Sequence, residues 1–399
     1  MYREGETLMN RRPLRSNDIR ERNEKLVLNL IYTHRGISQS EVAQLTSLKP
    51  PTVFRIFSEL EGRGIIRECS GEKDLSDRKG RKPSFYCVDP GSFYAIGVDF
   101  WSVSAAIVVV DFSGAAVYQN VVNFETEINA DEVTDRIEAL IGESIRASDI
   151  DTQRILGIGV GAPGMVDINE GIVLRYPRID GMKNFNISER LTSAFDLPVF
   201  IHNNASVIAL AEYRYGATKG EDSLLAVLIR SGVGGAFIHG GRLFVSRNKT
   251  AVEIGHMSVD VNGKTCECGA AGCLETYLSE DAILELVRSQ IGITSLEELE
   301  RRLQNDDNQT VKGMRDVARL LVHAVYSLSN ILNPEAFLVV SRFQGISDFF
   351  SQEIRAGLQS TPQTMRNGEA RVISRQYDPL IACKGACDLV YDHFFAQAT

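Results

Sequence analysis

The feature that most constrains the fold is a cluster of one histidine and three cysteines within the segment 252–277. His256 is followed after nine residues by Cys266, and Cys268 and Cys273 complete the set. One imidazole and three thiolates in so short a segment are typical of a closed, tetrahedral structural zinc site. Three glycines lie beside the cysteines and would let the backbone turn sharply: Gly263, Gly269 and Gly272. We therefore expect these four side chains to converge on Zn²⁺. The alternative is a small loop of reduced cysteines without metal.

Two carboxylates flank the cluster, Glu253 before His256 and Glu275 after Cys273. Carboxylates this close to a zinc site could orient its ligands or hydrogen-bond a polyhydroxylated ligand. The sequence E-I-G-H, followed by C-E-C-G-A-A-G-C-L-E, resembles the signature of the ROK family, which groups bacterial sugar kinases with sugar-responsive repressors. The resemblance runs from about Phe93 to near the C-terminus. It implies that His256 binds zinc through one ring nitrogen and faces a sugar with the other.

The body of the chain has the pattern of an α/β fold. The whole chain has 399 residues, 44% of them hydrophobic, which is too long for one ordinary domain. Apolar β-branched runs such as FYAIGVDF and SAAIVVVDFSG alternate with helical patterns in two halves, which indicates two lobes closing on a cleft. The ROK resemblance implies the actin-like ATPase (ribonuclease H-like) fold.

These patterns give expected domain boundaries. Residues 1–90 should form a winged helix-turn-helix, for the reasons given below, and residues 91–399 the sugar-binding body. We expect lobe one at about 91–203 plus the C-terminal helix, and lobe two at about 204–380, containing the zinc knuckle 256–273.

Cysteine usage and hydropathy indicate the compartment. The sequence has no apolar run long enough to cross a bilayer, and its N-terminus lacks the apolar core of a secretion signal. The seven cysteines are an odd number, which favours a reducing cytosol over a disulfide framework. We expect Cys383 and Cys387 to be buried core residues of a helix. The sequence thus predicts a cytoplasmic bacterial protein without a membrane partner.

The charge is distributed unevenly along the chain. The net charge is −9, yet residues 1–90 hold 17 Lys and Arg against 13 Asp and Glu, a balance of +4. The remaining residues hold 26 against 39, a balance of −13. A mildly basic head on an acidic body is consistent with a DNA-binding module attached to a domain with another role.

The first ninety residues have the element order of a winged helix-turn-helix. Residues 18–34 predict a helix with four apolar side chains on one face: Ile19, Leu26, Leu30 and Ile31. Ser38 and Glu41 form a capping signal for a second helix, and Pro50 opens a third. The expected inner face of the third helix comprises Val53, Ile56, Phe57 and Leu60. Two short strands, IIREC and SFYCV, then flank a basic segment that would be the wing.

In this motif the third helix enters the major groove of DNA through its N-terminal residues. The candidates there are Lys49, Thr52 and Arg55, which can contact base edges or phosphates. The candidates on the wing are Arg78, Arg81 and Lys82, which suit phosphates or a narrow minor groove. The head also resembles that of ROK repressors, in which a G-R-x-P wing recurs, here Gly80-Arg81-Lys82-Pro83. The alternative is a three-helix protein-interaction module with a solvated basic loop.

Three further residues are candidates for sugar binding. Gly164 ends one apolar strand, where backbone could approach a sugar closely, and Asn203 and Asn204 end another. Amides suit hydroxyl recognition because each offers donors and an acceptor. The asparagines could instead cap the following helix, and both roles can hold at once. With the carboxylates and the histidine, the expected sugar site comprises Gly164, Asn203, Asn204, Glu253, His256 and Glu275.

The resemblance also allows a test for kinase activity. ROK kinases carry Asn-Asp where this chain has Asn203-Asn204, and the aspartate is the general base for the sugar hydroxyl. The family's phosphate loop D-x-G-G-T-K is replaced by Asp99-Phe100-Trp101-Ser102-Val103-Ser104, and its late glycine run by Ser341-Arg342-Phe343. The loop Ser231–Gly235 keeps its glycines. Three departures from the parts that transfer phosphate predict a body without catalytic residues.

The sequence therefore predicts a sugar-responsive transcriptional regulator, with repression as the expected mode and activation left open. Its expected partners are double-stranded operator DNA, a monosaccharide or derivative as effector, and a second copy of itself in a homodimer or homotetramer. Zn²⁺ would be structural. Two alternatives stay open. One is an active ATP-dependent sugar kinase with an N-terminal appendage, and the other is a regulator controlled by a protein partner.

Overall fold

The structure is a computed structural model that describes residues 16–69, 84–124, 128–359 and 370–396. The chain divides into two compact units. The first comprises the described residues of Met1–Tyr94, Asp111–Ala115 and Tyr391–Thr399, and the second comprises Ala95–Val110 and Ala116–Val390. The two units are described separately below. The domain boundaries expected from the sequence stay a prediction.

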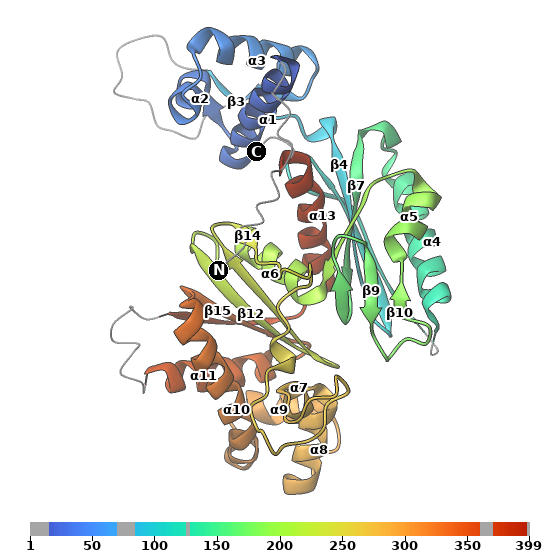
Figure 1. The fold of residues 1–399 in the computed structure, drawn as a ribbon, viewed down its shortest axis with the longest axis vertical. Coiled ribbons are helices and arrows are strands. Elements are labelled where there is room, and N and C mark those ends of the chain that lie inside the picture. The colour runs from blue at the N-terminus through green and yellow to red at the C-terminus, as the bar shows by residue number, and fades with distance from the viewer. Residues whose placement is uncertain (1–15, 70–83, 125–127, 360–369, 397–399) are drawn as a thin grey trace, which may run out of the picture. The chain divides into compact units, whose positions relative to one another are not determined.

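The first unit contains the expected winged helix-turn-helix elements (Figure 1). Its helices are α1 (Ser16–His34), α2 (Gln39–Thr46) and α3 (Pro50–Gly62). Its strands are β1 (Ile37–Ser38), β2 (Ile66–Cys69) and β3 (Phe85–Val88), which form an antiparallel sheet in the order β1-β3-β2. The hairpin of β2 and β3 was predicted. The short strand β1 was not, because two residues carry no periodicity.

Local sequence signals explain the helix boundaries in this unit. The Ser38 hydroxyl accepts from the Glu41 N–H, and the Glu41 carboxylate accepts from the Ser38 N–H, so α2 begins with a full capping box. Pro50 occupies the first turn of α3, where its missing N–H leaves no bond unmade. The predicted inner face of α3 is buried as expected: Val53, Ile56, Phe57 and Leu60.

The predicted inner face of α1 is wrong in part. Ile31 is buried, but Ile19 and Leu26 are 47% and 37% exposed. The helix instead buries Val27 and Leu28, so its inward face is turned by about one residue from the predicted one. Ile19 lies in the first turn of a 19-residue helix, and only the later turns are packed.

Aromatic side chains from distant parts of the sequence form part of the core of the first unit. The ring of Tyr32 on α1 lies 5.4 Å from Phe112, 5.4 Å from Tyr391 and 5.1 Å from Phe395, measured between ring centroids. Rings at such separations contribute beyond the area that they bury. The core that supports α1 therefore includes residues from the segment 111–115 and from the C-terminal end of the chain.

The second unit contains two five-stranded sheets with the same topology (Figure 1). The first has the order β11-β7-β4-β5-β6, with β4 (Tyr94–Phe100), β5 (Ser104–Asp111), β6 (Ala116–Asn123), β7 (Ile155–Ala162) and β11 (Val199–Asn203). The second has the order β14-β13-β12-β15-β16, with β12 (Ser223–Ile229), β13 (Val233–His239), β14 (Arg242–Leu243), β15 (Ala336–Ser341) and β16 (Arg371–Gln376).

In each sheet the strand that comes first in the sequence is central. The next two lie on one side and the last two on the other. The neighbours β5 and β6, and β12 and β13, are antiparallel, whereas β7 and β11, β12 and β15, and β15 and β16 are parallel. This duplication confirms the predicted two-lobed α/β fold. A small third sheet has the order β10-β9-β8, with β8 (Met165–Asp167), β9 (Ile172–Arg175) and β10 (Lys183–Phe185).

Helices surround these sheets. They are α4 (Ala130–Ser148), α5 (Ile187–Phe195), α6 (Asn204–Tyr215), α7 (Glu275–Leu278), α8 (Glu280–Ile291), α9 (Leu296–Gln304), α10 (Asn308–Leu332), α11 (Gln344–Gln359) and α13 (Pro379–Ala396). Cys383 and Cys387 are buried in α13, as predicted. A Cβ on Gly159 would lie 1.8 Å from the backbone oxygen of Ala386, so only glycine permits α13 to approach β7 this closely. Among the described residues, no helix is long and apolar enough to span a membrane.

Candidate effector pocket and metal site

A cavity of about 730 Å³ lies within the second unit, lined by both large sheets and by the cysteine-rich segment. Its lining includes residues of β9 and the turn after it, the start of α6, the ends of β12 and β13 that face each other, and the segment 253–279. The structure brings all six expected sugar-site residues to this cavity: Gly164, Asn203, Asn204, Glu253, His256 and Glu275. The part of each in ligand binding stays a prediction.

The four predicted metal ligands converge beside this cavity. The ligand atoms of His256, Cys266, Cys268 and Cys273 all lie within 4.8 Å of one another. The Cys266 Sγ is 3.7 Å from His256 Nδ1, and the Cys268 Sγ is 3.6 Å from the Cys273 Sγ. A tetrahedral zinc ion with Zn–S bonds of about 2.3 Å separates its sulfurs by about 3.8 Å. The donor set and its spacing therefore fit a four-coordinate soft metal ion.

The backbone of the segment explains how the ligands meet. The N–H of Gly269 donates to the Cys266 carbonyl, and the Cys266 N–H donates to the Ala270 carbonyl, which folds the loop back on itself. Gly272 has φ +66°, and a Cβ there would lie 1.7 Å from the Asp260 oxygen. Glycine at that position is thus required for the turn that aims Cys273 inward.

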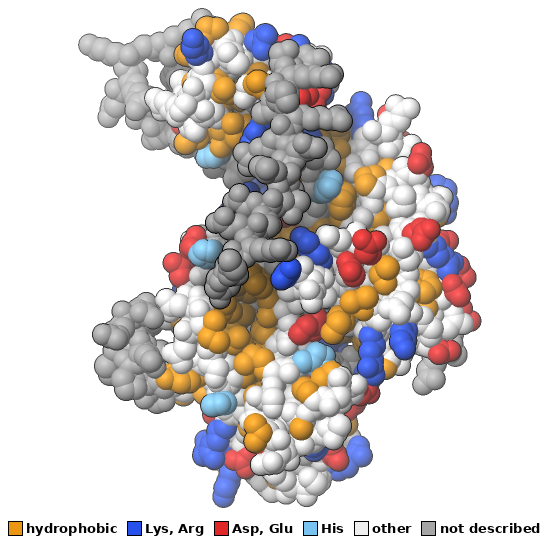
Figure 2. All heavy atoms as spheres, in the orientation of Figure 1, with side chains coloured by type: hydrophobic (Ala, Val, Ile, Leu, Met, Phe, Trp, Pro, Cys, Tyr) orange, Lys and Arg blue, Asp and Glu red, His pale blue; other side chains and the backbone are white. Residues whose placement is uncertain are grey.

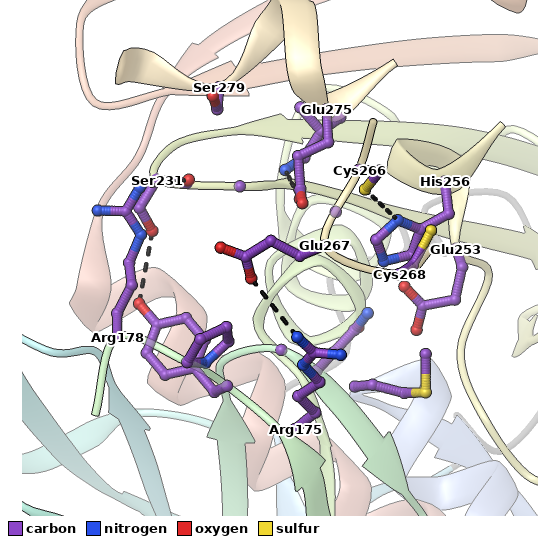
Figure 3. A pocket seen from close by; sticks show the side chains of 18 of the residues that line it. Arg175, Arg178, Ser231, Glu253, His256, Cys266, Glu267, Cys268, Glu275 and Ser279 are labelled. Carbon is purple, nitrogen blue, oxygen red and sulfur yellow. Dashed lines mark hydrogen bonds and ion pairs between the residues drawn. The ribbon is translucent and has the colours of Figure 1, made fainter. Parts of the chain in front are cut away.

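The carboxylates beside the metal cluster differ in their contacts (Figure 3). Glu275 accepts from the backbone N–H of Val233 at 2.9 Å, which fixes it at the start of β13. Glu253 Oε1 is buried and has no hydrogen-bond partner among the residues that the structure describes. Burial, together with the negative charge of Glu275, raises the pKa of Glu253 to about 7. An unpaired buried oxygen that lines a cavity is a ready acceptor or donor for a ligand hydroxyl.

The two asparagines have different roles at the start of α6. Asn203 Oδ1 accepts from the Ser206 N–H at 2.9 Å and so caps the helix, as the sequence allowed, while the residue also lines the cavity. Asn204 Nδ2 donates to Asp99 Oδ1 at 2.6 Å. Asn204 Oδ1 is buried, and no described residue hydrogen-bonds to it. Asn204 is therefore a donor to a buried carboxylate on one side and an open acceptor on the other.

Asp99 is the centre of a buried polar cluster that sequence analysis did not predict. It is 1% exposed and accepts hydrogen bonds from Trp101 Nε1, at 3.1 Å, and from the Tyr377 hydroxyl. Burial raises the pKa of Asp99 to about 6, although its hydrogen bonds oppose this shift. The Arg230 guanidinium lies 3.4 Å from the ring centre of Trp101 and 4.3 Å from that of Tyr377. The cluster thus connects the ends of β4 and β12 and the residue after β16.

Two arginines of the cavity were also missed as site residues. Arg175 ends β9, and its Nη2 lies 3.9 Å from Oε2 of Glu267, which stands between the predicted metal ligands Cys266 and Cys268. Arg178 Nη2 donates to the Ser231 carbonyl at 3.0 Å and pairs with Asp281. A single arginine in a loop carries no sequence signal of its own, because its neighbours are set only by the fold. Gly164, at φ +76°, packs against the Arg175 backbone oxygen, where a Cβ would lie at 2.2 Å.

The expected DNA contacts of the third helix lie at its start. Lys49 is the N-cap of α3 and is exposed, Arg55 is exposed on the first turns, and Thr52 is half-buried. Arg55 is 3.9 Å from Glu59 on the same helix. The wing residues Arg78, Arg81 and Lys82 lie outside the described residues. Figure 2 shows acidic and basic side chains interspersed over the displayed face of the second unit.

Comparison with known proteins gives concordant results for both units. Residues 95–393 match the ROK family, and residues 20–67 match the winged helix-turn-helix DNA-binding family. A putative xylose repressor of Caldicellulosiruptor sp. (strain Rt8B.4) is 28% identical over 84% of this chain and 87% of its own length. The DNA-binding transcriptional dual regulator NagC of Escherichia coli (strain K12) is 26% identical over 80% of each chain.

A solved structure shares the fold along nearly the whole chain. The crystal structure of a ROK family transcriptional regulator, a homolog of the E. coli MLC protein, superimposes with a TM-score of 0.79. It has 23% sequence identity and covers 96% of this chain and 99% of its own. The ROK match covers most of the chain and contains the cavity and the cysteine cluster. This chain therefore belongs to the ROK family.

Proposed function

We propose that this protein is a sugar-responsive DNA-binding repressor whose kinase-like body binds a monosaccharide or derivative without phosphorylating it. The main support is that one chain joins a winged helix-turn-helix to a ROK body. In that body all six expected sugar-site residues line one cavity. The relatives reported above are named as repressors or regulators, which agrees with this combination. The effector is proposed to act by binding the DNA-competent and DNA-incompetent states with different affinity.

The proposed sugar contacts follow from the unpaired polar atoms of the cavity. Within the described part of the chain, Glu253 Oε1 and Asn204 Oδ1 are buried without partners, and hydroxyl groups of a bound sugar would satisfy them. In this proposal His256 binds zinc through Nδ1, the nitrogen beside Cys266, and offers Nε2 to the sugar. Zn²⁺ is structural, because four protein ligands leave no open position for water. It holds the loop that carries His256 and Glu275.

The same contacts support the absence of phosphoryl transfer. An amide at position 204 has no useful basicity, and its N–H is already given to Asp99. Trp101 occupies the segment that would be the first phosphate loop, and the Arg230 guanidinium lies against its ring. Bulky side chains there leave little bare backbone for phosphate oxygens. The proposed body is thus a former kinase that retains sugar binding.

DNA binding is proposed for the first unit. Lys49, Thr52 and Arg55 would enter the major groove, and the wing residues would contact phosphates. One winged helix buries too little surface for adequate specificity, so a homodimer or homotetramer on a pseudo-palindromic operator is proposed. The protein would act in the bacterial cytoplasm and associate with the nucleoid when it binds its operator.

The test has two arms. Selection of random duplexes by the purified full-length protein should yield a pseudo-palindromic operator, and a screen of monosaccharides and their derivatives should find one that releases it. Incubation with ATP and the same sugars should produce no sugar-dependent ADP. Rapid ADP release that requires both the sugar and an intact sugar site would establish the alternative, an active sugar kinase. Failure to select any duplex would contradict the repressor proposal.

A further inference from the structure

An aromatic side chain that the proposed function does not use lies exposed on α3, the third helix of the winged helix-turn-helix (Figure 1). Phe54 is 61% exposed, whereas Phe57, three residues later on the same helix, is fully buried. Transfer of apolar surface out of water is favourable, so the Phe54 ring gains free energy when a partner covers it. The ring is therefore a candidate contact for whatever binds this face of α3.

The spacing of exposed residues shows which part of α3 a partner would meet. The face opposite the buried side chains carries four exposed residues: Pro51, Phe54, Arg55 and Ser58. Their separations of three and four positions place them along one side of the helix. Phe54 lies in the N-terminal half of α3, which begins at Pro50. In a helix-turn-helix this part of the third helix reaches base edges in the major groove.

The side chains next to Phe54 are cationic and only weakly engaged within the protein. Lys49 is the exposed N-cap of α3, and its side chain makes no capping bond. Arg55 Nε lies 3.9 Å from Glu59 Oε1, beyond hydrogen-bond distance, whereas Arg20 Nη2 donates to the same oxygen at 2.8 Å. The Phe54 ring thus lies between two cations that can contact phosphates, as the rows of phosphates flank the bases of a duplex.

The charges of α3 also run against its helix dipole. The helix has no acidic residue in its first turn and no basic residue in its last turn, where Glu59 and Glu61 lie instead. A helix by itself favours the reverse arrangement, with anions at its N-terminus and cations at its C-terminus. This distribution costs folding stability and leaves the N-terminal end of α3 strongly attractive to an anionic partner such as DNA.

We propose that Phe54 recognises thymine in the operator by packing its ring against the C5-methyl group in the major groove. This inference rests on the proposed function and names a base that one residue reads. The C5-methyl of thymine is an apolar group among the donors and acceptors of the major groove. A phenyl ring has no donor or acceptor of its own, so contact with this methyl is how it distinguishes thymine from the other bases.

Two competing roles exist for Phe54. The ring can form an interface between two copies of the chain, or it can simply stay in water, since single exposed apolar side chains are common on protein surfaces. Neither role involves the bases of the operator. Removal of one methyl group from the DNA would therefore leave both unaffected, and the dependence of binding on that methyl distinguishes the proposal from them.

The experiment is a double-mutant cycle between protein and DNA. The probes are the operator that the full-length protein selects from random duplexes and copies of it with uracil in place of one thymine at a time. Uracil differs from thymine only by the absent C5-methyl group, so base pairing and every other edge group are retained. Loss of one buried methyl contact corresponds to about a fourfold loss of affinity. At least one uracil copy should bind the native protein that much more weakly.

Three variants complete the cycle. Phe54→Ala should bind the thymine and uracil duplexes within about 1.5-fold of each other, because the contact is absent from both complexes. Phe54→Leu keeps an apolar contact and should retain part of the preference. Leu45→Ala is the matched control, since Leu45 is 59% exposed on α2, and it should retain the full preference. The methyl also alters DNA shape, but Phe54→Ala would still sense that effect, so only the change in the ratio is diagnostic.

The inference is overturned if no uracil copy binds more weakly than the operator, or if Phe54→Ala keeps the preference of the native protein. A selected operator without thymine in its half-sites would also overturn it. Weaker self-association of Phe54→Ala in sedimentation, with the preference unchanged, would assign the ring to an interface between copies. Failure to select any duplex would instead contradict the proposed function, so the two failures are distinguishable.

Discussion

Replacement of Asn204 by aspartate is the sharpest test of the buried hydrogen bond between Asn204 and Asp99. If the body were one residue from a working kinase, Asn204→Asp would supply the missing general base. The structure predicts a different outcome. Asn204 Nδ2 lies 2.6 Å from Asp99 Oδ1, and both residues are buried. The variant would place two carboxylates where the native protein has a donor and an acceptor.

The cost of the variant can be estimated in two ways. Two charges about 3 Å apart repel by about 5 kcal/mol at an effective dielectric constant near 20. Keeping one proton on the pair at pH 8 costs about 6 kcal/mol relative to carboxyls that ionise near pH 4 in the unfolded chain. The hydrogen bond of the shared proton replaces the charge-assisted bond that Asn204 Nδ2 donates to Asp99 in the native protein, so it offsets little of this cost. The free energy of unfolding should therefore fall by about 5 kcal/mol at pH 8.

The effect should depend on pH in a defined direction. The pair has a folded-state pKa above its unfolded value, since Asp99 alone already has a pKa of about 6. The folded state then binds more protons than the unfolded state, so the penalty grows as pH rises from about 4. At pH 5 proton uptake costs only about 1.5 kcal/mol, so the loss of stability should be much smaller than at pH 8.

The assay is urea unfolding followed by the fluorescence of Trp101, the only tryptophan of the chain and a donor to Asp99. Asn203→Asp is the matched control. Its Oδ1 caps α6, and aspartate caps helices as well as asparagine does, so stability should change by less than about 0.5 kcal/mol. Equal stability of Asn204→Asp and native protein at pH 8, or sugar-dependent ADP release by the variant, would refute the reasoning.

Three other changes test separate parts of the structure. Cys268→Ser should lose the bound zinc, measured by elemental analysis, and lower the melting temperature, whereas Cys69→Ser in the first unit should retain the metal; equal zinc in both variants would remove Cys268 from the ligand set. Arg55→Ala should weaken operator binding by about 1–3 kcal/mol and leave effector binding unchanged; unchanged operator affinity would place Arg55 outside the interface. Gly159→Ala should destabilise the protein by about 1–3 kcal/mol through overpacking against α13. Gly142→Ala is the control and should not destabilise the protein, because its new Cβ would meet only the flexible side chain of Arg146, at 3.4 Å. Similar melting temperatures for the two variants would contradict the close approach of α13 to β7.

Predictions from the sequence succeeded where the signal is local. The capping box of Ser38 and Glu41, the proline that opens α3 and the buried face of α3 each depend on residues within a single helix and its cap. The predicted inner face of α1 was wrong at Ile19 and Leu26. Helical spacing shows which side chains share a face, but it does not show which part of that face the rest of the chain covers. Tyr32 illustrates the limit further, since its aromatic contacts come from positions 112, 391 and 395.

The candidate site shows the same division. The metal ligands lie within one short segment, so their spacing alone predicted that they converge. The cluster around Asp99 could not be predicted, because Arg230 and Tyr377 follow two different strands and lie more than a hundred residues away in the sequence. Its only local signal was Trp101, which was interpreted as the loss of a phosphate loop. In the structure Trp101 donates to Asp99, and its ring lies against the Arg230 guanidinium.

The hydrogen bonds of Asp99 explain how a carboxylate can be buried at the end of β4. A buried carboxylate without partners would be strongly destabilising. Asp99 instead accepts hydrogen bonds from Trp101, Tyr377 and Asn204. Trp101 follows β4 and Asn204 follows β11 in the first large sheet, and Tyr377 follows β16 in the second. Trp101 and Asn204 also line the cavity. A ligand that contacts them interacts with side chains whose hydrogen bonds join the two sheets, so its binding free energy depends on how the sheets are arranged. That dependence is what a sugar-responsive regulator requires, because a ligand shifts a conformational equilibrium only through its differential affinity for the two states.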